Sequence, residues 1–339
     1  MKRCVITGAA GFIGSRLAGM LQSAGIDVTC LVRGRSRTQA LEKLQLRVVR
    51  VEFDDAAALR SAVAGHDAVI HLAGLVRAMN AAELHAANAG GVRSVVEACA
   101  AQSTPPTLVV VSSLAAAGPA INGLPRHENQ PPTPVSDYGR SKLAGEVEAC
   151  RHAARVPVTI VRPSIVFGGG DRVTLAWFHS IARFGSHFVP GDVRQKFSVV
   201  HVDDLAEAIR VVAQRGERID PAVVPGSPTG PGIYFVGHPQ TVTWSEIGGL
   251  SADALGCKTP RMPVIPAPLL WGVGMFCEGV RKVVRRPVLI GLDKVREACA
   301  GSWTCSSQRL ADLGFDFTTP LSERFVQTVA DYRRLGLLR

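Results

Sequence analysis

Three side chains in this sequence have the residue types and spacing needed for acid–base chemistry at a carbonyl or alcohol group. Tyr138 and Lys142 lie four residues apart in the segment SDYGRSK, so on a helix they share one face. A phenol ordinarily titrates at about 10, and a nearby ammonium stabilises the phenolate and lowers this pKa toward the range useful for catalysis. Ser113 follows the apolar run 107–112 and can donate a hydrogen bond to an oxygen on which charge develops.

The first fifteen residues predict a cofactor site that would serve this chemistry. The β-branched run 3–7 is typical of a buried parallel strand, and residues 12–24 have the pattern of a helix. Glycines between the two let the backbone turn sharply and approach a pyrophosphate, which the N–H groups and positive dipole end of the helix would bind. The residues expected to contact the dinucleotide here are Gly8, Gly11, Phe12, Ile13 and Gly14.

The end of the second predicted strand, 27–32, bears on which dinucleotide is bound. NAD-binding units usually place an Asp or Glu there to hold the ribose 2′-hydroxyl. This chain has Val32, followed by Arg33, Arg35 and Arg37. A carboxylate would repel a 2′-phosphate, whereas an arginine can hold it through charged, forked hydrogen bonds. We therefore expect NADP(H), with NAD(H) as the alternative.

Two further segments fit a dinucleotide. Glu52 and Phe53 follow the third predicted strand, where they could flank the adenine; as an alternative, this acidic segment only caps a helix. The fourth strand ends in HLAG, and small residues there allow close contact with the cofactor. We expect contacts from Leu72, Ala73 and Gly74. His71 is interpreted as a packed residue, because nothing near it in the sequence marks it as a base.

The remaining pattern alternates strands with helices. Strands are expected over 3–7, 27–32, 46–51, 68–72, 107–112 and 158–162. Long helices are expected over 83–101 and 137–155. Such alternation predicts an α/β fold, a parallel sheet with helices on both faces and ligands at the carboxyl ends of its strands.

Composition narrows the class of protein. There is no signal-peptide pattern, and the eight cysteines show no C-x-x-C spacing, so a cytoplasmic, reducing location is expected. The net charge of +10 fits an anionic ligand or a membrane surface. Nucleic acid is not expected, because no basic stripe is interleaved with aromatics. No spacing suggests a metal site.

The motifs TGAAGFIG, VVVSS, YGRSK and FSVVHVDDLAEA together resemble the extended short-chain dehydrogenase/reductases, the NAD(P)-dependent epimerase and dehydratase family. The resemblance implies a doubly wound Rossmann domain (1–163 plus about 197–236) and a smaller, discontinuous substrate domain (164–196 plus about 237–339). It also implies that Tyr138 transfers the proton, Lys142 binds the nicotinamide ribose and Ser113 orients the substrate oxygen. Further positions that match the nicotinamide side are Ser112, Pro163 and Val166. Members commonly form homodimers through the two long helices.

Two positions in the substrate region bear on which branch of the family the chain resembles. Nucleotide-sugar enzymes carry an asparagine where this chain has Ile165, and an arginine that holds the diphosphate where it has Phe197. An apolar residue cannot pair with a diphosphate. The segment RPSIVFGGGD is more similar to the 3β-hydroxysteroid dehydrogenase and dihydroflavonol reductase branches, although Arg194 and Lys196 leave room for an anionic substrate. Ile165 and Phe197 are the predicted substrate contacts.

The segment 263–277 is uncharged, and the basic residues Arg281, Lys282, Arg285 and Arg286 follow it. It is short for a spanning helix, which needs about 20 residues. We expect a core helix of the substrate lid; the alternative is peripheral contact of residues 263–286 with an anionic membrane. The final stretch, 310–339, is expected to be a helix pair that only packs.

The sequence thus predicts an NADP(H)-dependent oxidoreductase that interconverts a ketone and a secondary alcohol on a hydrophobic, steroid-, lipid- or flavonoid-like substrate. Two alternatives are a nucleotide-sugar 4-epimerase or 4,6-dehydratase with bound NAD, and a non-catalytic protein that senses the dinucleotide.

Overall fold

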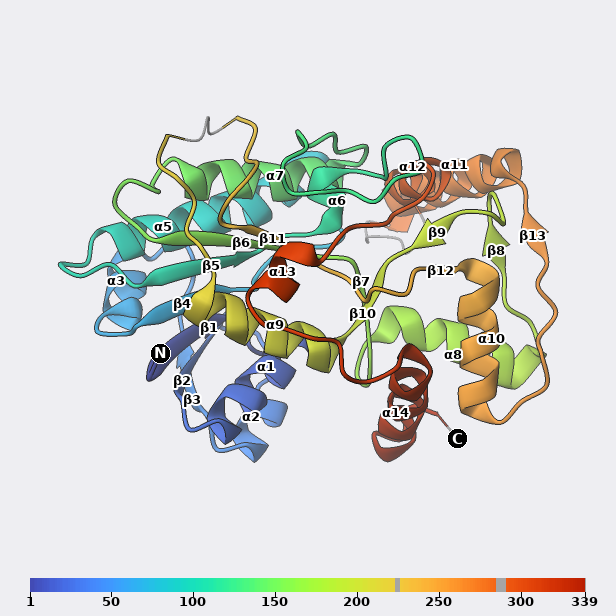
Figure 1. Cartoon of the computed structure of the whole chain (residues 1–339), viewed down its shortest axis with the longest axis horizontal. Helices are drawn as coiled ribbons and strands as arrows, with labels where there is room; N and C mark the ends of the chain where they lie inside the picture. Colours follow the sequence, from blue (N-terminus) through green and yellow to red (C-terminus); the bar gives the residue numbers. More distant parts are fainter. Residues whose placement is uncertain (223–225, 285–290, 339) are drawn as a thin grey trace.

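A computed structural model describes residues 1–222, 226–284 and 291–338. Its main feature is a seven-stranded sheet in the order β11-β6-β5-β4-β1-β2-β3, in which every neighbouring pair is parallel (Figure 1). The strands are β1 (Arg3–Thr7), β2 (Asp27–Val32), β3 (Arg47–Arg50), β4 (Ala68–His71), β5 (Thr107–Val111), β6 (Val158–Pro163) and β11 (Ile233–Val236). The predicted doubly wound parallel sheet is confirmed, and its strand order reverses between β1 and β4, where such sheets bind ligands.

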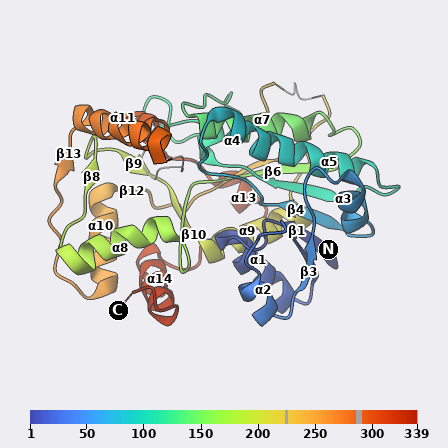
Figure 2. The same ribbon diagram turned by 180° about the vertical axis from the view of Figure 1, so that it is seen from behind.

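Helices cover both faces of this sheet, which explains why its strands are almost continuously apolar. The helices α1 (Phe12–Ser23) and α9 (Val202–Arg215) pack on one face, and α3 (Ala56–Val63), α5 (Gly91–Ala100) and α7 (Asp137–Cys150) on the other (Figures 1 and 2). Each face has its own buried cluster, and Leu17 and Val95 are fully buried examples from the two sides. The sheet is thus a rigid platform for residues at its carboxyl edge.

The two long helices differ in detail from their predicted extents. The first is built from α4 (Ala81–His85), a π-helical turn η1 (Ala86–Gly90) and α5, so its course is interrupted by one wider turn. The second, α7, ends at Cys150 rather than at residue 155. Its C-terminal half is held to β6 by a fully buried ion pair between Arg162 and Glu146, with a shortest N–O distance of 2.6 Å. This pair fixes α7, which carries Tyr138 and Lys142, against the sheet.

A smaller lobe adjoins the sheet at its carboxyl edge (Figure 1). It contains the strand pairs β7–β10, β9–β12 and β8–β13. These strands are β7 (Ile165–Phe167), β8 (Val189–Pro190), β9 (Lys196–Phe197), β10 (Val199–His201), β12 (Val242–Thr243) and β13 (Val264–Ile265). Its helices are α8 (Arg172–Phe184), α10 (Trp244–Leu255), α11 (Ala267–Val284), α12 (Leu292–Cys299) and α14 (Leu321–Arg334), whereas α13 (Gln308–Asp312) packs on the large sheet through Leu310. Two short helices, α2 (Gln39–Lys43) and α6 (Leu114–Ala117), follow β2 and β5. The predicted domain bounds stay a prediction.

The helix α11 is not the core helix that its uncharged sequence predicts. Most of its side chains are exposed, and Leu270 is one of the few that are buried. The hydropathy of a segment does not determine whether another element packs against it. Here α12 packs against one side of α11 only, at Gly274. No helix in the described ranges is both long and apolar enough to cross a membrane. Arg285 and Arg286, and the side chain of Lys282, lie outside what the structure describes.

Candidate active site

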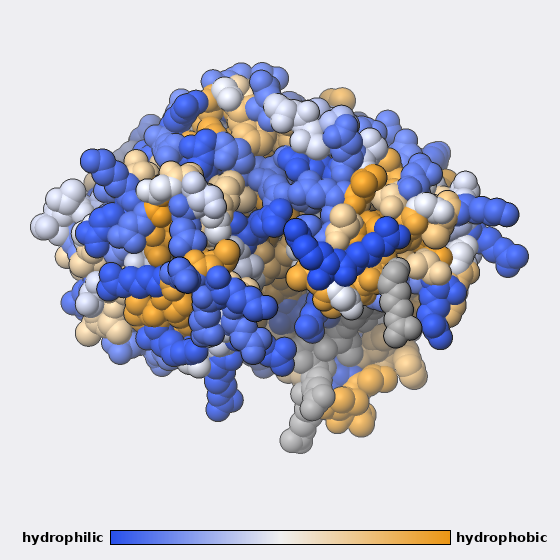
Figure 3. Space-filling model, turned by 90° about the horizontal axis from the view of Figure 1, so that it is seen from below, coloured by the Kyte–Doolittle hydropathy of each residue, from blue (hydrophilic) through white to orange (hydrophobic). Residues whose placement is uncertain are grey.

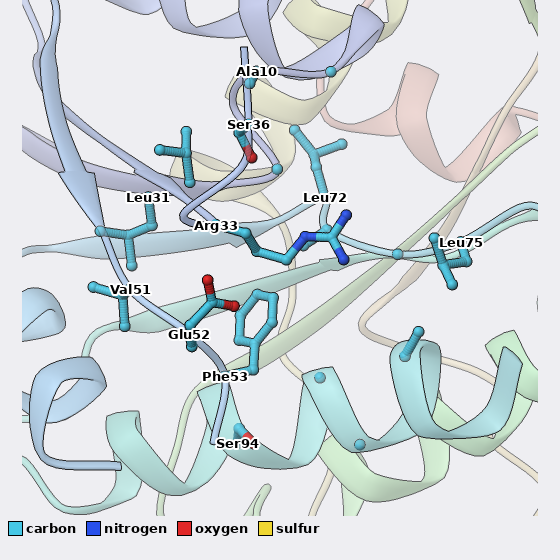
Figure 4. A pocket seen from close by; sticks show the side chains of 18 of the residues that line it. Ala10, Leu31, Arg33, Ser36, Val51, Glu52, Phe53, Leu72, Leu75 and Ser94 are labelled. Carbon is cyan, nitrogen blue, oxygen red and sulfur yellow. The ribbon is translucent and has the colours of Figure 1, made fainter. Parts of the chain in front are cut away.

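A cavity of about 690 Å³ opens at the carboxyl ends of β1 to β4, beside the reversal of strand order. It is lined by predicted cofactor residues, namely Gly8, Gly11, Arg33, Glu52, Phe53, Leu72, Ala73 and Gly74, and also by Arg37 and Ser36. Figure 4 shows the side chains of Arg33, Glu52 and Phe53 converging on its interior. The sequence predicted these lining residues because they follow the ends of the predicted strands, where a parallel sheet binds its ligand.

The glycine turn is shaped for close backbone packing. Gly8 has φ of +71°, and a Cβ there would lie 2.7 Å from the amide nitrogen of Ala73. A Cβ on Gly14 would collide with the carbonyl of Gly8. Any larger residue would therefore separate β1 from β4 or from α1. Gly11, in contrast, borders the cavity, so this turn can hold a phosphate with backbone N–H groups as the fold predicts.

The loop after β2 presents two of its three arginines to the cavity. Arg33 and Arg37 line the cavity, whereas Arg35 is not among its lining residues. The loop is fastened from β3: Glu52 accepts a hydrogen bond from the Gly34 amide at 2.8 Å, and Arg50 donates to the Gly34 carbonyl at 2.8 Å. Glu52 therefore orients the loop that carries Arg33.

Ser113, Tyr138 and Lys142 come from two elements that meet at the carboxyl end of β5. Ser113 caps α6 by accepting a hydrogen bond from the Ala115 amide at 3.1 Å, so its hydroxyl hydrogen is left to donate elsewhere. Lys142 Nζ donates to the Val111 carbonyl at 2.7 Å. A Cβ on Gly74 would lie 3.8 Å from Lys142 Nζ, which places the ammonium beside the lining of the cavity.

The pKa of Tyr138 differs from the sequence-based expectation. The pKa of Tyr138 is raised to about 12, mainly by burial; a hydrogen bond with Ser113 opposes this rise, and the charge of Glu297 adds to it. Burial lowers the pKa of Lys142 to about 8, with Glu146 opposing the change. The expectation that Lys142 lowers the Tyr138 pKa is wrong for this structure, because the ammonium is directed at the Val111 carbonyl. Tyr138 is therefore protonated at neutral pH, as a proton donor must be.

Asn88 is a part of the site that the sequence analysis missed. It lies in the π-helical turn η1, is buried, and links the segment after β4 to the catalytic helix. Its amide nitrogen donates to Ser141 Oγ at 2.8 Å and to the Leu75 carbonyl at 2.9 Å, and its oxygen accepts from the Leu75 amide at 2.7 Å. The only signal in the sequence was one carboxamide among small and apolar residues. The π-helical turn, a feature that often marks a functional site, becomes visible only in the structure.

The helix α12 supplies a second group of residues that the sequence analysis missed. Asp293 accepts hydrogen bonds from the amides of Asp137 at 2.6 Å and of Tyr138 at 3.1 Å, at the first turn of α7. Glu297 accepts from Ser136 Oγ at 2.6 Å and pairs with Lys294, whose Nζ lies 5.2 Å from the centre of the Tyr138 ring. Anionic groups at a helix N-terminus are favourable. The smaller lobe thus holds the N-terminal end of α7, which carries Tyr138, in place.

We expect Asp293→Ala to weaken this attachment. Losing an acceptor at a helix N-terminus costs about 0.5–2 kcal/mol, and kcat should fall because the backbone of Tyr138 is no longer held. Urea unfolding and steady-state rates measure the two effects. The matched control is Asp253→Ala on α10, an exposed aspartate. Equal stability and equal kcat for the Asp293 and Asp253 variants would show that the contact does not position Tyr138.

The wall next to Tyr138 is apolar. Tyr138 and Ile165 pack against a buried cluster that contains Phe197 and Trp303, with Trp244 against its edge. Phe197 is 3% exposed, with its ring 4.9 Å from the Trp244 ring. It therefore backs the wall, whereas the half-buried Ile165 can face a ligand directly.

The remaining predicted contacts lie around the same edge of the sheet. Ser112 is buried, and its hydroxyl has no hydrogen-bond partner among the residues that the structure describes. Pro163 ends β6, and Val166 lies in β7. Phe12 and Ile13 are in the first turn of α1 and do not line the cavity.

His71 is buried and packed, as the sequence analysis interpreted it. Its Nδ1 lies 2.8 Å from Thr7 Oγ1, and burial together with the charge of Lys142 lowers the pKa of His71 to about 3. The ring is therefore neutral at physiological pH and joins β4 to β1.

Comparison with known proteins agrees with this geometry. The model of the NAD dependent epimerase/dehydratase family matches residues 4–226, which hold the glycine turn, Ser113, Tyr138 and Lys142. The chain belongs to this family. It is accordingly an NAD(P)-dependent enzyme of the extended short-chain dehydrogenase/reductase type, and the resemblance drawn from its motifs is confirmed.

Relatives of this epimerase/dehydratase-family enzyme include reductases, and proteins of the same fold include sugar epimerases. It is 30% identical to ceramide reductase of Caulobacter vibrioides, over 98% of this chain and 95% of that protein. It is 25% identical to 2-alkyl-3-oxoalkanoate reductase of Stenotrophomonas maltophilia, over 92% and 94% of the two chains. UDP-glucose 4-epimerase of Thermus thermophilus, solved with NAD, has the same fold, with a TM-score of 0.74, 22% identity, and coverage of 98% and 99%.

Proposed function

We propose that this enzyme is an NADP(H)-dependent reductase that interconverts a ketone and a secondary alcohol on a hydrophobic, lipid-like substrate. The observation that carries the proposal is the arrangement around Tyr138: a protonated phenol bonded to Ser113, close to Lys142, against the apolar wall of Ile165 and Trp303. Such a site can protonate a carbonyl oxygen. It has Phe197 where nucleotide-sugar enzymes have the arginine that pairs with the diphosphate.

In the reductive direction, each residue has a separate task. When bound, the nicotinamide supplies the hydride that reduces the carbonyl carbon. Ser113 donates a hydrogen bond to the carbonyl oxygen, and Tyr138 transfers its proton to that oxygen as negative charge develops. The hydrogen bond with Ser113 lowers the Tyr138 pKa and so favours the phenolate that this transfer leaves, while Lys142, whose ammonium lies beside Gly74, would hold the nicotinamide ribose. One hydride and one proton convert the ketone into the alcohol, and the reverse reaction returns both.

The preference for NADP(H) is supported by the loop after β2. Arg33 points into the cavity, and no carboxylate ends β2 (Figure 4). Two carboxylates, Glu52 and Asp54, line the cavity, and Glu52 is engaged by the Gly34 amide. Arg33 is thus available to pair with a 2′-phosphate.

The substrate class is supported by the wall beside Tyr138 and by the names of relatives. Two reductases that match the chain along most of its length are named for ceramide and for a 2-alkyl-3-oxoalkanoate, which are both lipid-like. An apolar wall contributes favourable burial to a hydrocarbon chain. We therefore assign a lipid ketone or its alcohol.

The competing function is a nucleotide-sugar 4-epimerase or 4,6-dehydratase, which structural neighbours such as the UDP-glucose 4-epimerase make a definite alternative. A panel of carbonyl compounds with NADPH, followed by loss of NADPH absorbance, tests the proposal. A reductase oxidises NADPH with an alkyl ketone and shows no thermal shift with UDP- or dTDP-sugars. NAD retained through purification together with stabilisation by a nucleotide sugar would overturn it. Dinucleotide binding without any turnover would favour a sensing protein.

A further inference from the structure

The polarity of the helix α11 is opposite to that of an ordinary surface helix. Its large apolar side chains form an outward stripe at helical spacing, while soluble proteins place such a stripe against their core. The stripe consists of Leu269, Val273, Phe276, Val280 and Val283. Phe276 is 73% exposed and Val283 is 83% exposed. Figures 1 and 2 both place α11 along the outer edge of the smaller lobe.

The inward side of α11 is fixed by packing and by polar contacts. A Cβ on Gly274 would lie 2.8 Å from the side chain of Val295, so α11 and α12 approach closely at this point. Arg281 pairs with Glu278 and donates to the carbonyl of Met79. These charged residues are partly buried, whereas the apolar stripe faces out. These contacts fix the orientation of α11. Rotating the helix about its axis to bury the apolar stripe would break the packing at Gly274 and the hydrogen bonds of Arg281.

The same helix borders a second cavity, one lining residue of which contacts the catalytic tyrosine. A cavity of about 280 Å³ lies between α11, α12 and the segment after β4, with Arg281, Asp137 and Lys294 in its lining. Lys294 contacts the Tyr138 ring. Lys294 thus borders this cavity and also lies over the Tyr138 ring, so a single side chain separates the space beside α11 from the phenol.

Exposed cations and further apolar side chains adjoin the stripe. Val76 and Arg77 line the same cavity and are exposed. The β8–β13 pairing brings the exposed Phe188 beside Val264, which leads into α11, and Arg261 is exposed next to them. Seen from below, an apolar patch projects from the lower edge of the molecule (Figure 3).

We propose that the α11 stripe docks this enzyme on an anionic lipid surface, from which the substrate enters beside α11. The proposal rests on the proposed function for its substrate. Apolar side chains with neighbouring arginines fit the boundary between acyl chains and anionic headgroups. A second copy of the chain is the poorer partner, because two chains of net charge +10 with exposed arginines by the stripe repel each other.

Vesicle flotation of the full chain tests the docking without requiring turnover. The protein is mixed with phosphatidylcholine vesicles with or without phosphatidylglycerol. We expect it to float with the anionic vesicles, less so at high salt, and the double variant Phe276→Glu, Val283→Glu to bind them about tenfold or more weakly. The matched control is Val326→Glu on α14, which is 55% exposed and lies away from α11 (Figure 1).

Three further readouts make the outcome decisive. Turnover of a water-soluble ketone should be equal in all variants, whereas turnover of a vesicle-embedded ketone should fall only in the double variant. Light scattering reports the oligomeric state. Wild-type protein that stays in the soluble fraction, or a double variant that binds vesicles normally but no longer forms a dimer, would overturn the proposal. Flotation without any ketone turnover would retain the docking surface and reject the reductase.

Discussion

Replacing Tyr138 by phenylalanine is expected to lower kcat about 10²- to 10⁴-fold, the usual contribution of a positioned acid. The phenol is the proton donor beside Ser113, and phenylalanine keeps the ring but has no proton to transfer. The affinity for NADPH should be unchanged, because Tyr138 does not line the dinucleotide cavity. Steady-state rates with the best ketone of the panel and fluorescence titration with NADPH measure the two quantities.

The chain offers a matched control for this substitution. Tyr332 is a buried tyrosine in the smaller lobe, and its hydroxyl donates to the Asp171 carbonyl at 2.7 Å, far along the chain from the catalytic residues. Tyr332→Phe makes the same chemical change and should lower stability while leaving kcat near the wild-type value. If Tyr138→Phe kept full turnover, or if both variants lost it equally, Tyr138 would not be the acid.

Replacing Arg33 by aspartate is expected to move the preference from NADPH to NADH. A hydrogen bond to a charged partner contributes about 1.5–3 kcal/mol, so the Kd for NADPH should rise by about 10- to 100-fold. A carboxylate at this position also repels a 2′-phosphate, whereas it can accept a hydrogen bond from the 2′-hydroxyl of NADH. Dissociation constants for both dinucleotides, measured by fluorescence titration, give the ratio.

Arg35→Asp controls for the change in net charge. Arg35 belongs to the same loop but does not line the cavity, so its replacement changes the charge of the chain equally without removing the proposed contact. We expect its effect to be small and sensitive to salt. Equal affinity of the wild-type protein for NADPH and NADH, or identical behaviour of the two variants, would contradict the assignment to Arg33.

The sequence alone was sufficient for six of the seven strands of the sheet, all but β11, and for the dinucleotide cavity. Strands β1 and β2 have the bounds that the sequence predicts, and all their residues after the first are buried, because both faces of the sheet are covered. The glycine turn was equally predictable, because glycine adopts the positive φ of Gly8 without strain and has no Cβ to collide with Ala73. These features depend on neighbours in the chain, and a local pattern therefore encodes them.

The tertiary structure determined the hydrogen bonds, pKa shifts and exposures that depend on residues far apart in the chain. Asp293 is 156 residues from Asp137, the amide of which it binds, and no local pattern couples the two. The raised pKa of Tyr138 arises from burial and from Glu297, which only folding brings near the phenol. The uncharged segment of α11 has the same hydropathy whether it is buried or exposed. Its exposure was settled by the way α12 packs against Gly274 and leaves the opposite face uncovered.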